Sequence, residues 1–402
     1  VRFFLLIAGL TGFALYTTFT VLTTLVLLII PISSIPKFQK QKNNTILESD
    51  LKSPKTFQDK IAKSKLYKKL KTFFDEDFED LLETYKPTVD IKPEQKIADA
   101  VLNLAKSSDE LTTYLQKQQI KPEEFQILVT TLDHYINFKP AKHLAPLGQT
   151  LSFGYTKTLE NFAKPITGQN QYLTKTEKEA IDQIEKIILR PQNNNVILSG
   201  EPGVGRHATI ENLASAIANS HLPTLSAKQL IYLDTIALAG TGKTLIEVKS
   251  NFESILKEAE HAGNVILVID QVDKISSAKD ERIDLSEVLI FTLRESIMPT
   301  IGITTTDDFN QYLRPNAALL KYFEIIDIEE PNQDDTLQIL IGKALNSAYR
   351  DKVFSNLNAL TEIAKRSNQL IKDRKQPEKA IVLFDEIKAD AKTLTQKITI
   401  DL

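Results

Sequence analysis

The sequence predicts an α/β fold in which helices sandwich a parallel sheet, followed by a lobe made only of helices. Three observations support this. Short apolar runs alternate with amphipathic helical segments between residues 177 and 330, which is typical of a parallel sheet with helices on both faces. A glycine-rich turn at residues 200–205 joins the first run to a helical segment. After Pro331 the pattern is helical over residues 336–348, 357–367 and 378–391.

The N-terminal stretch predicts a transmembrane helix within residues 1–36. Residues 3–36 carry no charge, and Phe, Leu, Ile, Val and Thr dominate residues 3–32. A helix that crosses a bilayer needs about 20 apolar residues, whereas a cleaved signal peptide, the alternative, has an apolar part of about 7–15. Lys37, Lys40 and Lys42 follow at once. By the positive-inside rule they predict a single-pass membrane protein with the rest of the chain in the cytoplasm.

Two helical regions are expected between the anchor and the sheet. Residues 37–92 read as a linker followed by amphipathic helices, whose basic half either contacts anionic lipid or is a solvated face. Residues 93–150 predict a small all-α domain, because apolar residues recur at helical spacing and Pro122 marks a helix start. His134 and His143 lack partners at metal-ligand spacing, so we expect structural or exposed roles.

Composition excludes some function classes. The chain has 402 residues, no cysteine and a net charge of −3. Without cysteine there are no disulfides and no thiolate chemistry, and the charge gives no basic field for a nucleic-acid partner. We therefore expect no nucleic acid among the partners.

The elements of the predicted α/β lobe, residues 151–330, follow from the apolar patterns. Strands are predicted at residues 196–199, 230–234, 265–270, 300–304 and 323–328. Helices are predicted at residues 181–188, 208–219, 245–262 and 285–294. Residues 331–402 are predicted to form a helical lid.

The turn after the first strand has the layout of a phosphate-binding loop. Glycines let the backbone approach phosphate oxygens, and the helix N-terminus that follows offers free N–H groups and a positive dipole end. Against the motif G-x-x-x-x-G-K-[ST], Arg206 replaces the Lys and His207 replaces the Ser or Thr. The predicted nucleotide-binding residues are consecutive: Gly200, Glu201, Pro202, Gly203, Val204, Gly205, Arg206, His207 and Ala208.

A second motif is the apolar run of residues 265–269, which ends in Asp270. It places a carboxylate at the carboxyl edge of a buried strand, where ligands bind in open α/β sheets. Opposite a phosphate loop, such a carboxylate holds the Mg²⁺ of bound ATP or ADP, so Asp270 is the predicted metal ligand. Residues 240–244 also spell the end of a phosphate loop, but Ala237 stands where its first glycine should be.

These motifs resemble the first AAA+ module of the Clp-type protein unfoldases. The resemblance spans about residues 151–390 and rests on the runs at 193–194, 199–205, 233–234, 256–260, 264–270, 301–305, 317–319 and 377–381. It implies an ATP-binding α/β lobe with a helical lid. It also implies a homo- or hetero-oligomeric ring of AAA+ subunits that acts on protein substrates.

The departures from the family pattern fall on working positions. Gln271 follows Asp270 where the family has Glu, and a carboxamide cannot take a proton from water. Lys321 and Tyr322 replace the paired arginine finger, and Thr244 replaces the aromatic residue of the pore loop. The sensor threonines match. The predicted catalytic set, degenerate in this chain, is Asp270, Gln271, Thr304 and Thr305.

Together these features predict a membrane-anchored, Clp-like ATP-binding protein with weak or no hydrolysis. Its expected role is a scaffold or regulatory subunit in protein quality control, including a subunit of a mixed ring that an active paralogue completes. The alternative is an active membrane-bound AAA+ ATPase that works as an unfoldase or chaperone.

Overall fold

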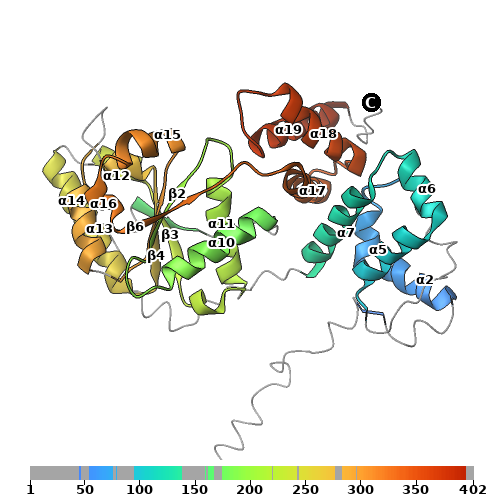
Figure 1. Cartoon of the computed structure of the whole chain (residues 1–402), viewed down its shortest axis with the longest axis horizontal. Coiled ribbons are helices and arrows are strands. Elements are labelled where there is room, and N and C mark those ends of the chain that lie inside the picture. Colours follow the sequence, from blue (N-terminus) through green and yellow to red (C-terminus); the bar gives the residue numbers. More distant parts are fainter. Residues whose placement is uncertain are drawn as a thin grey trace, which may run out of the picture.

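The α/β lobe, the lid and a group of N-terminal helices are arranged side by side (Figure 1). The structure is a computed structural model. It describes residues 45–46, 54–75, 78, 95–137, 159, 162–166, 174–219, 221–241, 244–276, 283–295 and 297–394. Within these residues no helix is both long enough and apolar enough to cross a bilayer. The predicted anchor at residues 1–36 lies outside them.

The sheet has six strands in the order β1-β3-β4-β5-β2-β6. Their bounds are β1 Ala163–Pro165, β2 Asn195–Ser199, β3 Gln229–Leu233, β4 Val265–Asp270, β5 Thr300–Ile303 and β6 Phe323–Asp327. The five predicted strands are present and run parallel to one another. The expectation of a purely parallel sheet is wrong, because the edge strand β1 pairs antiparallel with β3. β1 is too short to give a periodic signal.

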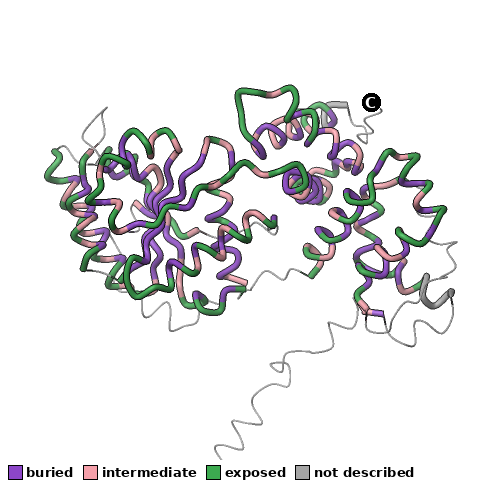
Figure 2. The backbone as a smooth tube through the Cα atoms, in the orientation of Figure 1, coloured by how far each residue is buried: buried purple, intermediate pink, exposed green. Residues whose placement is uncertain are grey.

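Both faces of the sheet are covered by helices. Successive strand residues point to opposite faces, so each strand contributes side chains to the core on both sides. Val196 and Leu198 pack with Ile184 of α10 on one face, whereas Ile197 belongs to the core with Phe252 on the other. The central strands β2 and β4 are therefore buried along their length, except for Asp270 at the end of β4, which is partly exposed (Figure 2). The helices and turns of the lobe are α10 Lys175–Ile188, α11 Arg206–Ala218, η4 Pro223–Leu225, α12 Thr235–Thr241, α13 Leu245–Ala262, η5 Val272–Ile275, α14 Ser286–Glu295, α15 Thr306–Asp308, η6 Phe309–Leu313 and α16 Ala317–Leu320.

The lid consists of three helices, α17 Gln333–Arg350, α18 Leu357–Leu370 and α19 Glu378–Leu394. Asn332 and Asn356 cap the first two, each accepting a hydrogen bond from a backbone N–H three residues on. Such caps supply partners for otherwise unpaired N–H groups. The helical lid predicted from the sequence is present.

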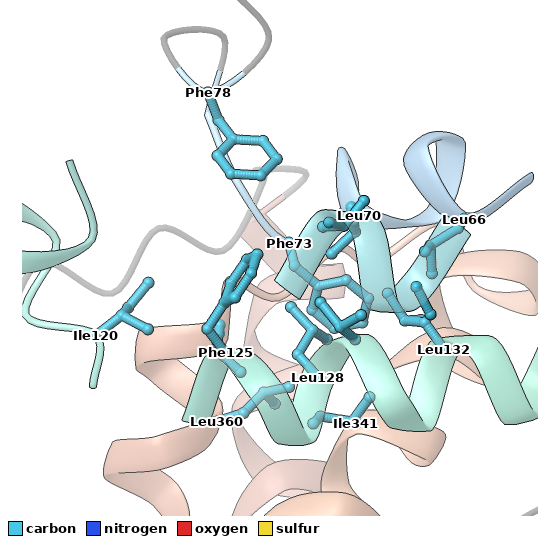
Figure 3. Packing of buried hydrophobic residues seen from close by; sticks show 14 of the residues in the cluster. Leu66, Leu70, Phe73, Phe78, Ile120, Phe125, Leu128, Leu132, Ile341 and Leu360 are labelled. Carbon is cyan, nitrogen blue, oxygen red and sulfur yellow. The ribbon is translucent and has the colours of Figure 1, made fainter. Parts of the chain in front are cut away.

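The N-terminal helices share one hydrophobic core with the lid. They are α2 Pro54–Lys63, α3 Lys65–Leu70, α5 Ile97–Ser107, α6 Asp109–Lys117 and α7 Pro122–Asn137. Phe125 and Leu128 of α7 are fully buried in the same cluster as Ile341 of α17 and Leu360 of α18 (Figure 3). The sequence analysis treated residues 93–150 as a domain of their own, and no sequence pattern indicated this contact.

We expect Leu128→Ala to destabilise the lid as well as α7. Leu128 has no exposed surface, and removing a buried leucine side chain typically costs about 2–5 kcal/mol. Hydrogen exchange should accelerate in both α7 and α17, while the free energy of unfolding in urea falls. Gln126→Ala, on the exposed side of α7, is the matched control and should leave both unchanged. Unchanged protection of α17 in Leu128→Ala would contradict a shared core.

Candidate nucleotide site

The glycine-rich loop connects β2 to α11 and takes the conformation of a phosphate-binding loop. Gly203 and Gly205 have φ values of +86° and +104°, in the region that favours glycine. Gly205 is the N-cap of α11, which begins at Arg206 and not at Ala208 as predicted. Arg206 and His207 are therefore the first two residues of the helix. Their backbone N–H groups belong to the free donors of its first turn.

A cavity of about 570 Å³ lies beside this loop, between the α/β lobe and the lid. Val204, Gly205 and Ala208 line it from the loop and α11, Ile328 from the linker after β6, and Ile339 from α17. Ligand pockets in proteins have about this volume and are mainly apolar with a few polar groups. Of the nucleotide-binding residues predicted, these three loop and helix residues face the cavity.

Glu177 contributes a carboxylate to the same cavity. Burial raises the pKa of Glu177 above its usual value, although hydrogen bonds from Thr174 oppose the increase. Glu177 and Asn212 are two of several polar residues in the lining, which combines apolar surface with further acidic side chains, those of Glu179, Glu211, Asp327 and Glu329.

Asp270 lies at the carboxyl end of β4, as predicted, and both of its carboxylate oxygens have protein partners. His207 Nε2 is 3.1 Å from Oδ1, and the Tyr232 hydroxyl donates a short hydrogen bond to Oδ2. Burial raises the pKa of Asp270, but the bonds from His207 and Tyr232 outweigh burial, so the pKa lies below its usual value. Asp270 is therefore an anion held by two side chains of the same lobe.

Tyr232 is the firmer of these two partners. The His207 side chain is 56% exposed, so solvent screens its pair with Asp270. Burial, followed by the bond to Asp270, raises the pKa of Tyr232. The phenol therefore stays protonated and donates. The sequence analysis missed Tyr232, because its position beside Asp270 depends on the pairing of β3 with β4.

Arg206 occupies the position of the motif lysine within an acidic environment. Four carboxylates interact with its charge, those of Glu201, Asp270, Asp273 and Asp308. Burial lowers the pKa of Arg206, and these carboxylates oppose the decrease. The positive charge at the end of the loop is thus already balanced by protein side chains.

The remaining predicted catalytic residues lie around this end of the loop. Thr304 is buried and donates to Asp273 Oδ1 at 3.0 Å. Thr305 caps α15 and donates to Asp308 Oδ2 at 2.7 Å. Gln271 is in the left-handed region, with φ 48°. The two sensor hydroxyls are therefore engaged by carboxylates of the chain itself.

The other substituted positions lie where the sequence indicated. Lys321 is exposed, and its ammonium group lies 6.0 Å from the centre of the Tyr322 ring. Thr244 is exposed and is the N-cap of α13. Gly240 and Thr241 are the last two residues of helix α12. A second phosphate loop must follow a strand, so the alternative of such a loop at residues 240–244 is wrong.

The lid contributes a contact to the loop that the sequence did not predict. Glu378, the first residue of α19, donates its backbone N–H to the Gly203 carbonyl at 3.4 Å. A Cβ atom at Gly203 would lie only 2.3 Å from Glu378 Oε2. The loop is therefore closed from the lid side, and Arg374 pairs with the Glu378 carboxylate at 3.5 Å.

Mg²⁺ does not fit the side chains around Asp270 in this arrangement. The ion prefers near-octahedral oxygen ligands, yet both Asp270 oxygens are occupied and residue 207 offers an imidazole in place of a hydroxyl. Among the described residues, no three His, Asp or Glu side chains are grouped so as to hold a metal ion.

This fold and loop define an AAA+ module, a P-loop α/β lobe with a helical lid. The profile of the AAA family, "ATPase family associated with various cellular activities", matches residues 196–329, and the AAA lid profile matches residues 332–402. The chain therefore contains an AAA domain followed by an AAA lid domain, and the relatives described next are Clp-type ATPases. The family resemblance read from the motifs is thus confirmed.

The most informative relatives are Clp chaperones and Clp protease subunits. The chain is 35% identical to the chaperone protein ClpB of Helicobacter hepaticus over 249 residues, which cover 61% of this chain and 28% of that protein. It is 33% identical to the ATP-binding subunit ClpC of Staphylococcus saprophyticus, over 58% of this chain and 29% of ClpC. The chain thus spans less than a third of the length of these relatives.

Solved structures agree on the fold. The Saccharomyces cerevisiae Hsp104:casein complex in its extended conformation superposes with a TM-score of 0.55 at 24% identity, over 60% of this chain and 42% of that one. The S. cerevisiae Hsp104-ADP complex gives 0.54 at 26% identity, over 59% of this chain and 42% of that one.

We expect Gly203→Ala to weaken nucleotide binding by about tenfold or more, since even a 1.4 kcal/mol effect gives that factor. The new methyl group would displace Glu378 and open the contact between loop and lid. Gly263→Ala is the matched control, because Gly263 also has a positive φ, +73°, but has open space around it. The positive φ by itself should cost each variant roughly 1–2 kcal/mol of stability. Fluorescence titration with a labelled nucleotide measures the difference, and equal affinities would contradict it.

Proposed function

We propose that this chain is a nucleotide-binding AAA+ subunit with weak or no ATP hydrolysis, and that it acts as a scaffold or regulatory subunit in protein quality control. The observation that carries the proposal is that residues needed for ATP hydrolysis are replaced while the fold of the α/β lobe is retained. Gln271 stands where a general base is needed, and Asp270 is already held by His207 and Tyr232. General-base catalysis contributes about 10²–10⁴-fold.

Nucleotide binding is retained in this proposal because the recognition elements are present. The positive-φ glycines shape the loop, and the N-terminus of α11 faces it. The cavity between lobe and lid offers apolar surface of the size a purine nucleoside needs. ATP and ADP are the proposed ligands, as the family implies.

The proposed partners are other AAA+ subunits and protein substrates. Clp relatives supply the precedent for both. Lys321 stands in the position of the arginine finger, and its ammonium group would bind a neighbour's phosphate without the bidentate geometry of a guanidinium. In a mixed ring, an active paralogue would supply the missing groups. Residues 3–36, uncharged and apolar, support a membrane anchor with the AAA+ module in the cytoplasm.

An active ATPase that works as an unfoldase is the second candidate. The observation in its favour is the presence of Asp270, Thr304 and Thr305 at the expected ends of β4 and β5. Against it, all three side chains are bonded to groups of the chain itself.

Steady-state phosphate release by the full chain separates the two candidates. We expect turnover to rise by about 10²-fold in the triple variant Gln271→Glu, Arg206→Lys, His207→Thr, because a general base and the motif residues are restored. Gln126→Glu, a new carboxylate on the exposed side of α7, is the control and should change nothing. Turnover of the natural sequence on the order of 1 s⁻¹, abolished by Asp270→Ala, would contradict the proposal.

A further inference from the structure

We infer that the site takes a nucleoside diphosphate without a metal ion and discriminates against the triphosphate. This inference rests on the proposed nucleotide binding and concerns the selectivity of the same site. It follows from three features of the loop region: the partners of Asp270, the charges around Arg206, and the position of the cavity.

The first feature is the closed shell around Asp270. In nucleotide sites that use Mg²⁺, the ion is held by the Walker B carboxylate and the hydroxyl of the motif Ser or Thr, and it bridges the β- and γ-phosphates. Here His207 Nε2 lies 3.1 Å from Asp270 Oδ1, and the Tyr232 hydroxyl bonds to Oδ2. His207 therefore replaces the motif hydroxyl and also occupies the Asp270 oxygen that would otherwise face the ion.

The backbone of Asp270 is fixed as well. Its carbonyl oxygen accepts a hydrogen bond from the Thr235 hydroxyl at 3.0 Å. The carboxylate thus cannot turn toward a ligand by a simple backbone movement. Freeing it for a metal ion requires breaking a partly buried phenol–carboxylate bond, and hydrogen bonds to a charged acceptor are among the stronger ones in proteins.

The second feature is the group of carboxylates around Arg206, which holds the motif position whose lysine reaches the β- and γ-phosphates. Asp273 is fully buried and Asp308 lies beside Thr305. Both interact with the charge of Arg206, the residue in the position of the motif lysine. A γ-phosphate without a bridging cation would face these carboxylates, and like charges at short range repel strongly where solvent is excluded.

The third feature is that Asp270, Asp273 and Asp308 are not among the residues that line the cavity. The loop and the first turn of α11 supply backbone N–H groups to an anion. The cavity beside Val204 and Ala208 is lined from the lid by Ile339, Gly342 and Ile381. Its lining also includes the acidic residues Glu177, Glu179, Glu211, Asp327 and Glu329. Apolar contact with the nucleoside and loop N–H groups directed at a phosphate therefore need no cation held by Asp270.

Titration of the full chain with fluorescent ADP and ATP analogues, each in EDTA and in millimolar MgCl₂, tests the inference. We expect ADP to bind with the same affinity, within twofold, in both buffers. ATP should bind at least tenfold more weakly than ADP in both. In His207→Thr, which restores the hydroxyl and removes the imidazole, Mg²⁺ should tighten ATP binding at least tenfold. His261→Thr, an exposed histidine at the end of α13, is the control and should behave as the natural sequence.

The outcomes separate this inference from the proposed function. Tightening of either nucleotide by tenfold or more on adding Mg²⁺ to the natural sequence overturns the inference while leaving nucleotide binding intact. ATP affinity equal to or above that of ADP does the same. If neither nucleotide binds at millimolar concentration in either buffer, the proposed nucleotide binding fails, and the inference falls with it.

Discussion

The account depends on one carboxylate, that of Asp270, and on what holds it. A parallel strand ending at the sheet edge places it opposite the N-terminus of α11, and the register of β3 places Tyr232 beside it. His207, the second residue of α11, completes the set. In sites that use a metal ion, this is the place where the protein meets the cation and the phosphates. In this chain both carboxylate oxygens of Asp270 are bonded to protein side chains.

The substitutions at the nucleotide site change its charged and polar groups in a consistent way. The imidazole of His207 occupies one carboxylate oxygen of Asp270, and four carboxylates interact with the charge of Arg206. The sensor hydroxyls are bonded to Asp273 and Asp308. Each change removes a partner that a triphosphate or its metal ion would need. The scaffold is untouched, because its stability comes from apolar burial on both faces of the sheet.

Most of the fold could be predicted from the sequence, because apolar burial on both faces of the sheet leaves a clear pattern of apolar residues. The strands of the lobe are continuous apolar runs between helical patterns, so β4, Val265–Asp270, was predicted to the residue. The start of α11 was misplaced by two residues, since glycine at the N-cap has no side-chain signal. Contacts that join distant segments were not predictable: the bond from Tyr232 to Asp270, the approach of Glu378 to Gly203, and the packing of α7 on the lid. They depend on tertiary arrangement, which periodicity does not encode.

The lid helix α17 links the two halves of the molecule. Ile341 packs among the N-terminal helices, while Ile339 and Gly342 line the cavity. The most direct test of the central claim is a crystal structure of the chain with ADP grown in MnCl₂, since manganese replaces Mg²⁺ and scatters anomalously. The account predicts ADP in the cavity, the bond between His207 and Asp270 intact, and no anomalous peak beside Asp270. A manganese peak between Asp270 and the β-phosphate, with His207 turned away, would contradict it.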